Sequence, residues 1–325
     1  MSPPTVSVVM PVFNRERFVG EAVQSILSQT FANLELIVVD DGSTDRTSEI
    51  LRSFADPRLH VIRQENRGIG AAMNTGLRAV RGEYVARLDS DDVWLPDMLE
   101  AQLRVLEAHP HAGLVYARAQ GMEHDGTPHH STWGIPQRYP DDSLRSMLYG
   151  DCTCNITIVA RRACFERGGL YDESLATGED WDLWLRVARH YPFAFNDRVV
   201  ARFRWHEDNI TGPNSPHYVD SLDGRVRVLD KFFSQPDLPA PITAMKPVAY
   251  QNLHVGTGLL WLGRRELRRA LRSFGKAVRQ GGNPPVTLLR IAWFVLSWEV
   301  LGKFPLGRRF VAWQAATRRR WREER

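Results

Sequence analysis

Hydrophobic and polar residues follow two alternating patterns along the first 120 residues. Short, nearly continuous apolar runs indicate strands buried on both faces, and they cover residues 6–10, 34–39, 59–62 and 84–88. Between these runs, apolar residues recur at helical spacing over residues 18–29, 46–54, 68–80 and 96–108. Strands that alternate with helices at this pitch predict a doubly wound α/β domain with a mostly parallel sheet.

The remainder of the chain has a different pattern. Residues 120–155 are rich in Gly, Pro and His and are expected to form a loop or flap. A second compact piece is expected over 155–205, with a strand near 156–160 and a helix over 180–189. The stretch GPNSP at 212–216 predicts a break, and the chain beyond about residue 221 is expected to be helical.

Composition places the chain among ordinary globular proteins. Of its 325 residues, 43% are hydrophobic and 25% are charged, which is enough apolar material for a sizeable core. Three cysteines are too few for a disulfide framework and favour a reducing compartment. The N-terminus lacks the basic and apolar regions of a secretory signal, and no window reaches the roughly 20 apolar residues of a membrane span.

Charge is distributed unevenly along the chain. Residues 264–325 contain 16 Lys and Arg against 4 Asp and Glu, whereas residues 1–263 contain 26 against 34. The basic tail mixes Arg with Trp and Phe, so it predicts either contact with an anionic membrane surface or a solvated cationic helix packed on the acidic body. Nucleic-acid binding is not expected, because the acidic body would repel phosphates.

Carboxylates are concentrated where the predicted strands end. Asp89, Asp91 and Asp92 lie within four residues behind a buried strand, and such crowding calls for a cation or for hydrogen-bond donors. Oxygen ligands with open positions suit Mg²⁺ or Mn²⁺, which also take substrate phosphates. Since ligands bind beyond the carboxyl ends of parallel strands, we expect one edge to gather Asn14, Asp40, Asp41, Asp89, Ser90 and Asp91.

Each of these acidic stretches also has a structural interpretation. The turn VVDDGSTD around Asp41 would cap a helix equally well. The stretch GEDWDLWLR opens a helix with Glu179 and Asp180, where the helix dipole favours acidic residues in any protein. The residues alone therefore leave both interpretations open.

Four ordered stretches together resemble the family 2 glycosyltransferases, which are inverting enzymes with the GT-A fold. They fall within roughly residues 5–210 and read VSVVMPVFNRERFVGEAVQSILSQTFANLELIVVDDGSTD, NRGIGAAMNTGL, GEYVARLDSDDVWLPDML and GGLYDESLATGEDWDLWLRVA. The resemblance implies a Rossmann-like nucleotide-diphospho-sugar transferase fold over residues 1–212. Its nucleotide-binding half would cover about 1–118 and its acceptor half about 119–212, followed by a basic helical region over 213–325.

The resemblance also implies roles for individual residues. Asp180 matches the catalytic base, and Glu179 is its acidic neighbour. Asp91 matches the metal ligand of the family's DxD motif, Asp89 would lie near the ribose or the metal, and His206 would complete the metal's ligands. The remaining residues expected to bind the donor are Pro11, Phe13, Asn14, Asp41, Arg67, Asn74 and Ser90. The family often has Arg before the equivalent of Asn74, but Met73 stands there, so Arg67 or another side chain would have to supply the cation for the diphosphate.

The implied activity is transfer of a sugar from a nucleotide-diphosphate donor, with UDP expected, to a hydroxyl of a saccharide or lipid-linked acceptor. Mn²⁺ or Mg²⁺ would be the cofactor, and the setting would be polysaccharide or glycolipid synthesis in the cytoplasm or at the cytoplasmic membrane face. Two alternatives stay open: a catalytically impaired nucleotide-sugar-binding protein, and a metal-dependent nucleotidyltransferase. A dinucleotide-dependent oxidoreductase is excluded, since no GxGxxG follows the first strand.

Overall fold

The computed structural model of the chain describes residues 3–207, 209, 218–280 and 284–296, which belong to two compact units. The first unit runs from Met1 to Asp237 and the second from Leu238 to Arg325. The predicted domain boundary at residue 212 lies outside the described residues. The division into a catalytic domain over 1–212 and a basic helical region over 213–325 therefore remains a prediction.

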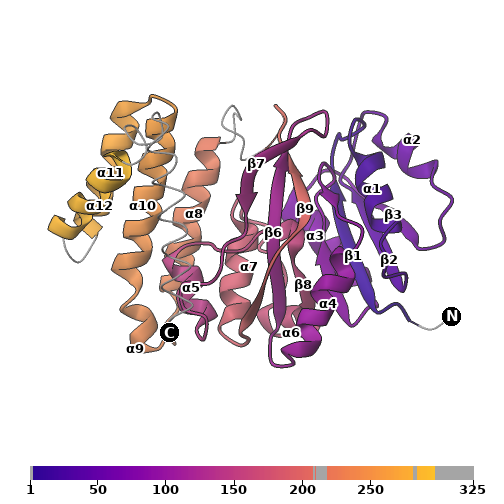
Figure 1. Cartoon of the computed structure of the whole chain (residues 1–325), viewed down its shortest axis with the longest axis horizontal. Coiled ribbons are helices and arrows are strands. Elements are labelled where there is room, and N and C mark those ends of the chain that lie inside the picture. The colour runs from indigo at the N-terminus through magenta and orange to yellow at the C-terminus, as the bar shows by residue number, and fades with distance from the viewer. Residues whose placement is uncertain (1–2, 208, 210–217, 281–283, 297–325) are drawn as a thin grey trace. The chain divides into compact units, whose positions relative to one another are not determined.

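A single mixed sheet forms the centre of the first unit (Figure 1). Its strand order is β3-β2-β1-β4-β8-β6-β9-β5, with β7 added beside β6. Neighbours are parallel in β1–β2, β1–β4, β2–β3 and β6–β9, and antiparallel in the other pairs. The strands are β1 (Val6–Val12), β2 (Leu34–Asp40), β3 (Leu59–Arg63), β4 (Tyr84–Arg87), β5 (Val93–Trp94), β6 (Leu114–Met122), β7 (Pro128–Trp133), β8 (Val159–Arg161) and β9 (Phe193–Arg204).

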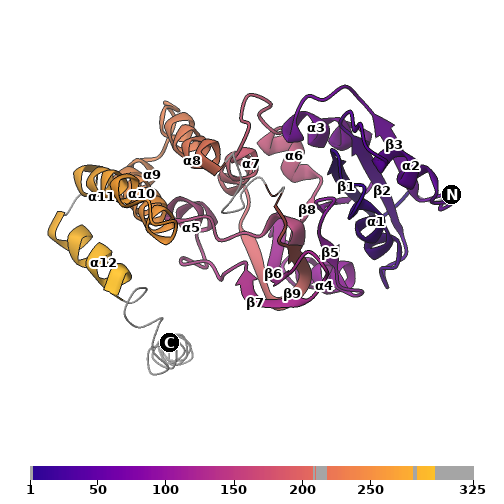
Figure 2. The same ribbon diagram turned by 90° about the horizontal axis from the view of Figure 1, so that it is seen from above.

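Helices cover both faces of this sheet (Figure 2), which explains why its first strands are continuously apolar. On one face, Val8 and Met10 belong to the main core together with residues of α1 and α4. On the other face, the side chain of Val9 lies against α3 at Gly76. The helices of this unit are α1 (Val19–Leu27), α2 (Thr47–Arg52), α3 (Ile69–Ala79), α4 (Met98–Ala108), α5 (Ser143–Tyr149), α6 (Ala163–Gly168), α7 (Glu179–Ala188) and α8 (Tyr218–Phe233), with a 3₁₀ turn at Asn155–Thr157.

The sequence-based elements of the first 110 residues are confirmed to within a few residues, but the prediction of a loop over 120–155 is wrong in part. That stretch contains β7 and α5. The pattern also missed the short strand β5 and the long strands β6 and β9. β7 is a largely exposed strand with the sequence PHHSTW, so it lacks the apolar alternation that marks a half-buried strand. β9 contains Asn196, Asp197 and Arg198, and its register with β6 shifts beside them.

The second unit is helical where it is described. It contains α9 (Ala240–Thr243), α10 (Lys246–Gly263), α11 (Leu267–Gln280) and α12 (Pro284–Leu296). The prediction that this part of the chain is helical is confirmed for the described residues. α10 and α11 pack as a hairpin, and their contact buries Gly258 beneath the ring of Phe274. Among the described residues, no helix combines the length and apolar character required to cross a bilayer.

We expect Gly82→Ala to lower the free energy of unfolding by about 1–3 kcal/mol, the usual cost of overpacking. A Cβ at Gly82 would lie 2.7 Å from the backbone nitrogen of Ser7 and 2.9 Å from the carbonyl oxygen of Thr5, so β1 would have to move away from β4. Gly150→Ala is the control, because a Cβ there meets no atom within 4 Å. Urea unfolding measures both, and equal stabilities for the two variants would contradict the prediction.

Candidate active site

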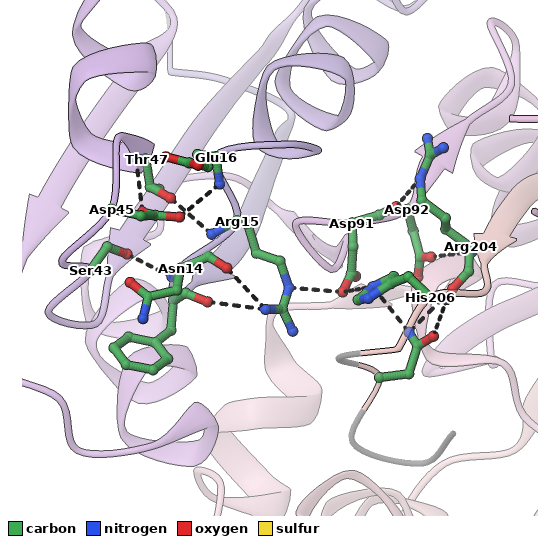
Figure 3. Close-up of polar contacts among 12 residues, drawn as sticks. Asn14, Arg15, Glu16, Ser43, Asp45, Thr47, Asp91, Asp92, Arg204 and His206 are labelled. Atoms are coloured by element: carbon green, nitrogen blue, oxygen red, sulfur yellow. Dashed lines mark hydrogen bonds and ion pairs between the residues drawn. The ribbon is translucent and has the colours of Figure 1, made fainter. Parts of the chain in front are cut away.

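The three crowded carboxylates behind β4 have three different environments. Asp89 accepts a hydrogen bond from Nε of Arg87 at 2.8 Å. Oδ2 of Asp91 lies 3.0 Å from Nε of Arg15 and 3.0 Å from Nε2 of His206 (Figure 3). Burial opposes ionisation of Asp91, but the contacts of His206 and Arg15 outweigh it and lower the pKa of this carboxyl.

Asp92 is accommodated in another way. Its side chain is buried, and Oδ1 accepts a hydrogen bond from the backbone N–H of Arg204 at 2.8 Å. Burial, reinforced by the charges of Asp91 and Asp89, raises the pKa of Asp92 well above its usual range. Asp92 fastens the end of β9 beside the turn, where Nε of Arg204 also donates to the carbonyl of Asp91.

His206 follows β9 and is held from several sides. Its ring lies 4.8 Å from the ring of Phe18, measured between centroids, and its side chain is only 3% exposed. Oδ1 of Asn209 accepts a hydrogen bond from the His206 backbone at 2.7 Å. His206 and Asp91 are thus in contact although they lie 115 residues apart in the chain, and the predicted role of His206 as a metal ligand remains a prediction.

The ends of β1 and β2 meet beside this turn, as expected for parallel neighbours. Asn14 adopts a positive φ of 50°, which Asn tolerates, and its Oδ1 accepts from the backbone N–H of Thr44 at 2.8 Å. Asp41 is buried and accepts hydrogen bonds from the backbone N–H groups of Arg67 and Gly68 at 3.0 and 2.8 Å. Phe13, the residue before Asn14, is 42% exposed.

Three residues of the NRGIGAAMN stretch have structural partners of their own. Nη2 of Arg67 pairs with Glu173 at 2.7 Å. Asn74 is buried, and its amide exchanges hydrogen bonds with the backbone of Tyr171, which fastens α3 to the loop before α7. Met73 is also fully buried, so this position belongs to the core. The donor-binding roles of Arg67 and Asn74, like those of Pro11 in β1 and the buried Ser90, remain predictions.

Glu179 and Asp180 begin α7, directly after Gly178 in a left-handed conformation. Asp180 Oδ1 accepts from the backbone N–H of Trp181 at 2.6 Å, and Oδ2 accepts from the side-chain amide of Asn155. The indole of Trp184 donates to the other amide atom of Asn155 at 2.8 Å. This second bond orients the Asn155 amide, so that its N–H group faces the Asp180 carboxylate.

Arg87 connects the two acidic groups. Its side chain is 7% exposed, with Nε on Asp89 and Nη1 3.5 Å from Oε1 of Glu179. Burial, followed by the charge of Asp180, raises the pKa of Glu179 to about 7, and Arg87 acts in the opposite direction. The turn behind β4 and the start of α7 therefore form one electrostatic unit.

The positions of Asp91 and His206 fit a divalent cation. Two neighbouring ligands of an octahedral ion, each about 2.1 Å from it, lie about 3.0 Å apart, and Oδ2 of Asp91 and Nε2 of His206 are separated by 3.0 Å. Within the described residues no three His, Cys, Asp or Glu side chains gather closely enough to bind a metal by themselves. Two protein ligands completed by phosphate and water are the arrangement that Mg²⁺ commonly uses.

Comparison with known proteins identifies the family. The sequence model described as Glycosyl transferase family 2 matches residues 7–166. The putative teichuronic acid biosynthesis glycosyltransferase TuaG of Bacillus subtilis is 34% identical over 213 residues, which cover 64% of this chain and 82% of TuaG. The chain belongs to glycosyltransferase family 2. It is therefore a glycosyltransferase, and relatives named for polysaccharide synthesis occur in its family.

Solved structures confirm the predicted GT-A fold of the glycosyltransferase. Mannosyltransferase PcManGT from Pyrobaculum calidifontis, in complex with GDP-Man and Mn²⁺, is 22% identical, with a TM-score of 0.62 over 97% of this chain and 85% of its own. TarS 1-349 of S. aureus, in complex with UDP-GlcNAc, is 20% identical, with a TM-score of 0.62 over 90% and 84%. Uncharacterised Rickettsia glycosyltransferases, 28–34% identical, are matched over 32–73% of their own length.

Three residues of this candidate active site were not predicted from the sequence: Arg15, Arg87 and Asn155. A signal existed for Arg87, because a cation inside the buried run YVARL demands an acidic partner. No local pattern indicates Arg15 or Asn155, since their partners Asp91 and Asp180 lie 76 and 25 residues away.

We expect Glu179→Gln to change how stability depends on pH. The pKa of Glu179 rises from 4.5 to about 7 on folding, so between these values the folded chain keeps a proton that the unfolded chain has lost. The wild type therefore loses stability as pH rises through this window, whereas the neutral Gln variant does not.

The free energy of unfolding of the variant, relative to wild type, should rise by roughly 1–3 kcal/mol from pH 4.5 to 8. Urea unfolding of the metal-free and nucleotide-free proteins across this range measures the difference. A difference that stays constant with pH would contradict the assignment.

Proposed function

We propose that the enzyme transfers a sugar from a nucleotide-diphosphate donor, with UDP as the expected nucleotide, to a hydroxyl of a saccharide or lipid-linked acceptor. The main supporting observation is that Arg87 connects the two acidic stretches, because it contacts both Asp89 behind β4 and Glu179 at the start of α7. Asp91, which contacts His206, and Asp180 belong to these same two stretches. Polysaccharide or glycolipid synthesis is the proposed setting, supported by the relative named for teichuronic acid biosynthesis.

The donor's nucleotide would lie across the ends of β1 and β2. Asp41 has carboxylate oxygens beside this edge, and the exposed ring of Phe13 offers an apolar surface on which a base can stack. Pro11 and Asn14 shape the same edge from β1 and the turn after it. The diphosphate would then extend toward Asp89, Ser90 and Asp91.

Mn²⁺ or Mg²⁺ is the proposed cofactor, with Asp91 and His206 as its protein ligands and Asp89 beside it. Support comes from their spacing and from the neighbour bound with GDP-Man and Mn²⁺. When bound, the ion would neutralise charge that develops on the leaving diphosphate.

Asp180 is the proposed general base. Its carboxylate is oriented by Asn155 and by the first turn of α7, so it has a fixed direction from which to accept the proton of the acceptor hydroxyl. The hydroxyl would attack the anomeric carbon on the face opposite the leaving diphosphate. A single displacement of this kind inverts the configuration and needs no covalent intermediate with the enzyme.

Asp180→Asn should lower kcat by roughly 10²–10⁴, the usual loss on removal of a general base, while the affinity for the donor nucleotide stays near wild type. Initial rates of transfer to acceptor, together with calorimetric titration of the nucleotide, measure the two effects. Undiminished turnover would contradict the role of Asp180. A wild type that binds nucleotide sugar but never transfers it would favour the impaired binding protein instead.

A cytoplasmic location, with peripheral contact to an anionic membrane, is a further part of the proposal. Most of the predicted basic tail lies outside the described residues, but α11 carries five cations and no acidic residue. Two leucines of the same helix, Leu267 and Leu271, are 59% and 60% exposed. One turn apart, they form an apolar strip beside Arg268 and Arg272, which is typical of helices that lie at a membrane surface.

Vesicle flotation tests this contact. We expect the full chain to float with vesicles containing phosphatidylglycerol and not with phosphatidylcholine alone. Arg268→Gln/Arg272→Gln should weaken binding about 10-fold or more, since each cation near an anionic surface is worth about 1 kcal/mol. Arg46→Gln/Arg52→Gln on α2 removes the same charge elsewhere and is the control. Equal flotation of both double variants, or none for wild type, would contradict membrane contact through α11.

A further inference from the structure

Arg15 lies in contact with Asp91, the proposed metal ligand. It follows β1, and its backbone N–H donates to Oγ1 of Thr47 at 2.8 Å. Nη1 donates to the carbonyls of Asn14 and Phe13 at 3.0 and 3.3 Å. These bonds hold the guanidinium between the donor edge and the turn behind β4, as Figure 3 shows.

Arg15 and His206 meet the same oxygen of Asp91. Nε of Arg15 and Nε2 of His206 are each 3.0 Å from Oδ2. An ion bound to Oδ2 of Asp91 at about 2.1 Å would need a lone pair of that oxygen, and the Arg15 guanidinium lies close to this lone pair in the structure. A divalent cation and the guanidinium would also repel each other at such a separation.

We propose that Arg15 is the counter-ion of Asp91 in the metal-free enzyme, and that a divalent cation must displace its guanidinium in order to bind. This inference rests on the proposed metal site. It assigns to Arg15 a role as a positioning residue: its contact holds the Asp91 carboxylate ready beside His206 while the ion is absent.

The displaced guanidinium has a direct consequence for the order of binding. Without the donor, displacement leaves the Arg15 charge beside the ion, so the affinity for the metal alone is reduced. A diphosphate at this edge neutralises both cations, so metal and donor strengthen each other's binding by the same factor. Arg15 therefore couples metal loading to the presence of the donor.

The test measures Mn²⁺ binding directly, from the electron paramagnetic resonance signal of free Mn²⁺, with and without UDP as the diphosphate probe. Arg15→Gln should bind Mn²⁺ alone roughly 10- to 100-fold more tightly than wild type, the equivalent of one charge-assisted hydrogen bond. The factor by which UDP strengthens Mn²⁺ binding should shrink in the same variant. A variant that had merely lost structure would bind Mn²⁺ more weakly in both conditions.

Arg17→Gln is the matched control, because it removes one positive charge two residues away on an exposed side chain. Its affinity for Mn²⁺ should stay within a few-fold of wild type. Should Arg15→Gln fail to fold, Arg15→Lys tests whether the affinity for Mn²⁺ alone increases. Lysine keeps the positive charge but lacks the rigid fork of guanidinium donors. Lysine should give a smaller gain in affinity for Mn²⁺ alone.

Unchanged or weaker Mn²⁺ binding in the folded Arg15 variants would overturn the inference while leaving the metal site standing. An equal gain in Arg17→Gln would also overturn it, because net charge would then be the cause. If wild type and Arg15 variants bind no Mn²⁺ yet still bind UDP, both this inference and the metal part of the proposed function fall, whereas nucleotide binding survives.

Discussion

Three carboxylates within four residues repel one another, and the site is built around the ways in which their charge is offset. Asp89 pairs with the buried cation of Arg87, and Asp91 contacts Arg15 and His206. Burial, together with the charges of Asp91 and Asp89, raises the pKa of Asp92. The groups that contact these carboxylates come from different parts of the chain. Arg15 comes from the end of β1, His206 from the end of β9, and Arg87 reaches toward the start of α7.

Strand pairing explains how stretches that are distant in the sequence come to lie at one edge of the sheet. Parallel pairing of β1 with β2 and β4 brings their carboxyl ends together. Antiparallel pairing of β9 with β5, the short strand directly after the turn, places His206 beside Asp91. Asp92 fastens β9 at that point, because its Oδ1 accepts a hydrogen bond from the backbone N–H of Arg204.

Much of the first half of the fold could be predicted, because strands covered on both faces are continuously apolar and helices between them are amphipathic. β7 and β9 could not, since β7 is exposed and β9 is interrupted by polar residues at a register shift. β5 and β6 were also missed, because β5 has only two residues and the apolar run of β6 is interrupted by Arg118 and Gln120. The acidic residues and His206 came from ordered motifs and family resemblance. Their partners Arg15 and Asn155 depend on tertiary structure alone, because no local spacing connects them with Asp91 or Asp180.

We propose that this crowded turn holds a divalent cation together with the donor diphosphate. The most informative measurement is thermal unfolding of wild type and Asp91→Asn with a panel of nucleoside diphosphates, with and without Mn²⁺. One nucleotide should stabilise the wild type by about 2.7 kcal/mol at a hundredfold excess over its dissociation constant. That stabilisation should require Mn²⁺ and disappear in Asp91→Asn. Equal stabilisation without Mn²⁺ and in the variant would contradict the claim.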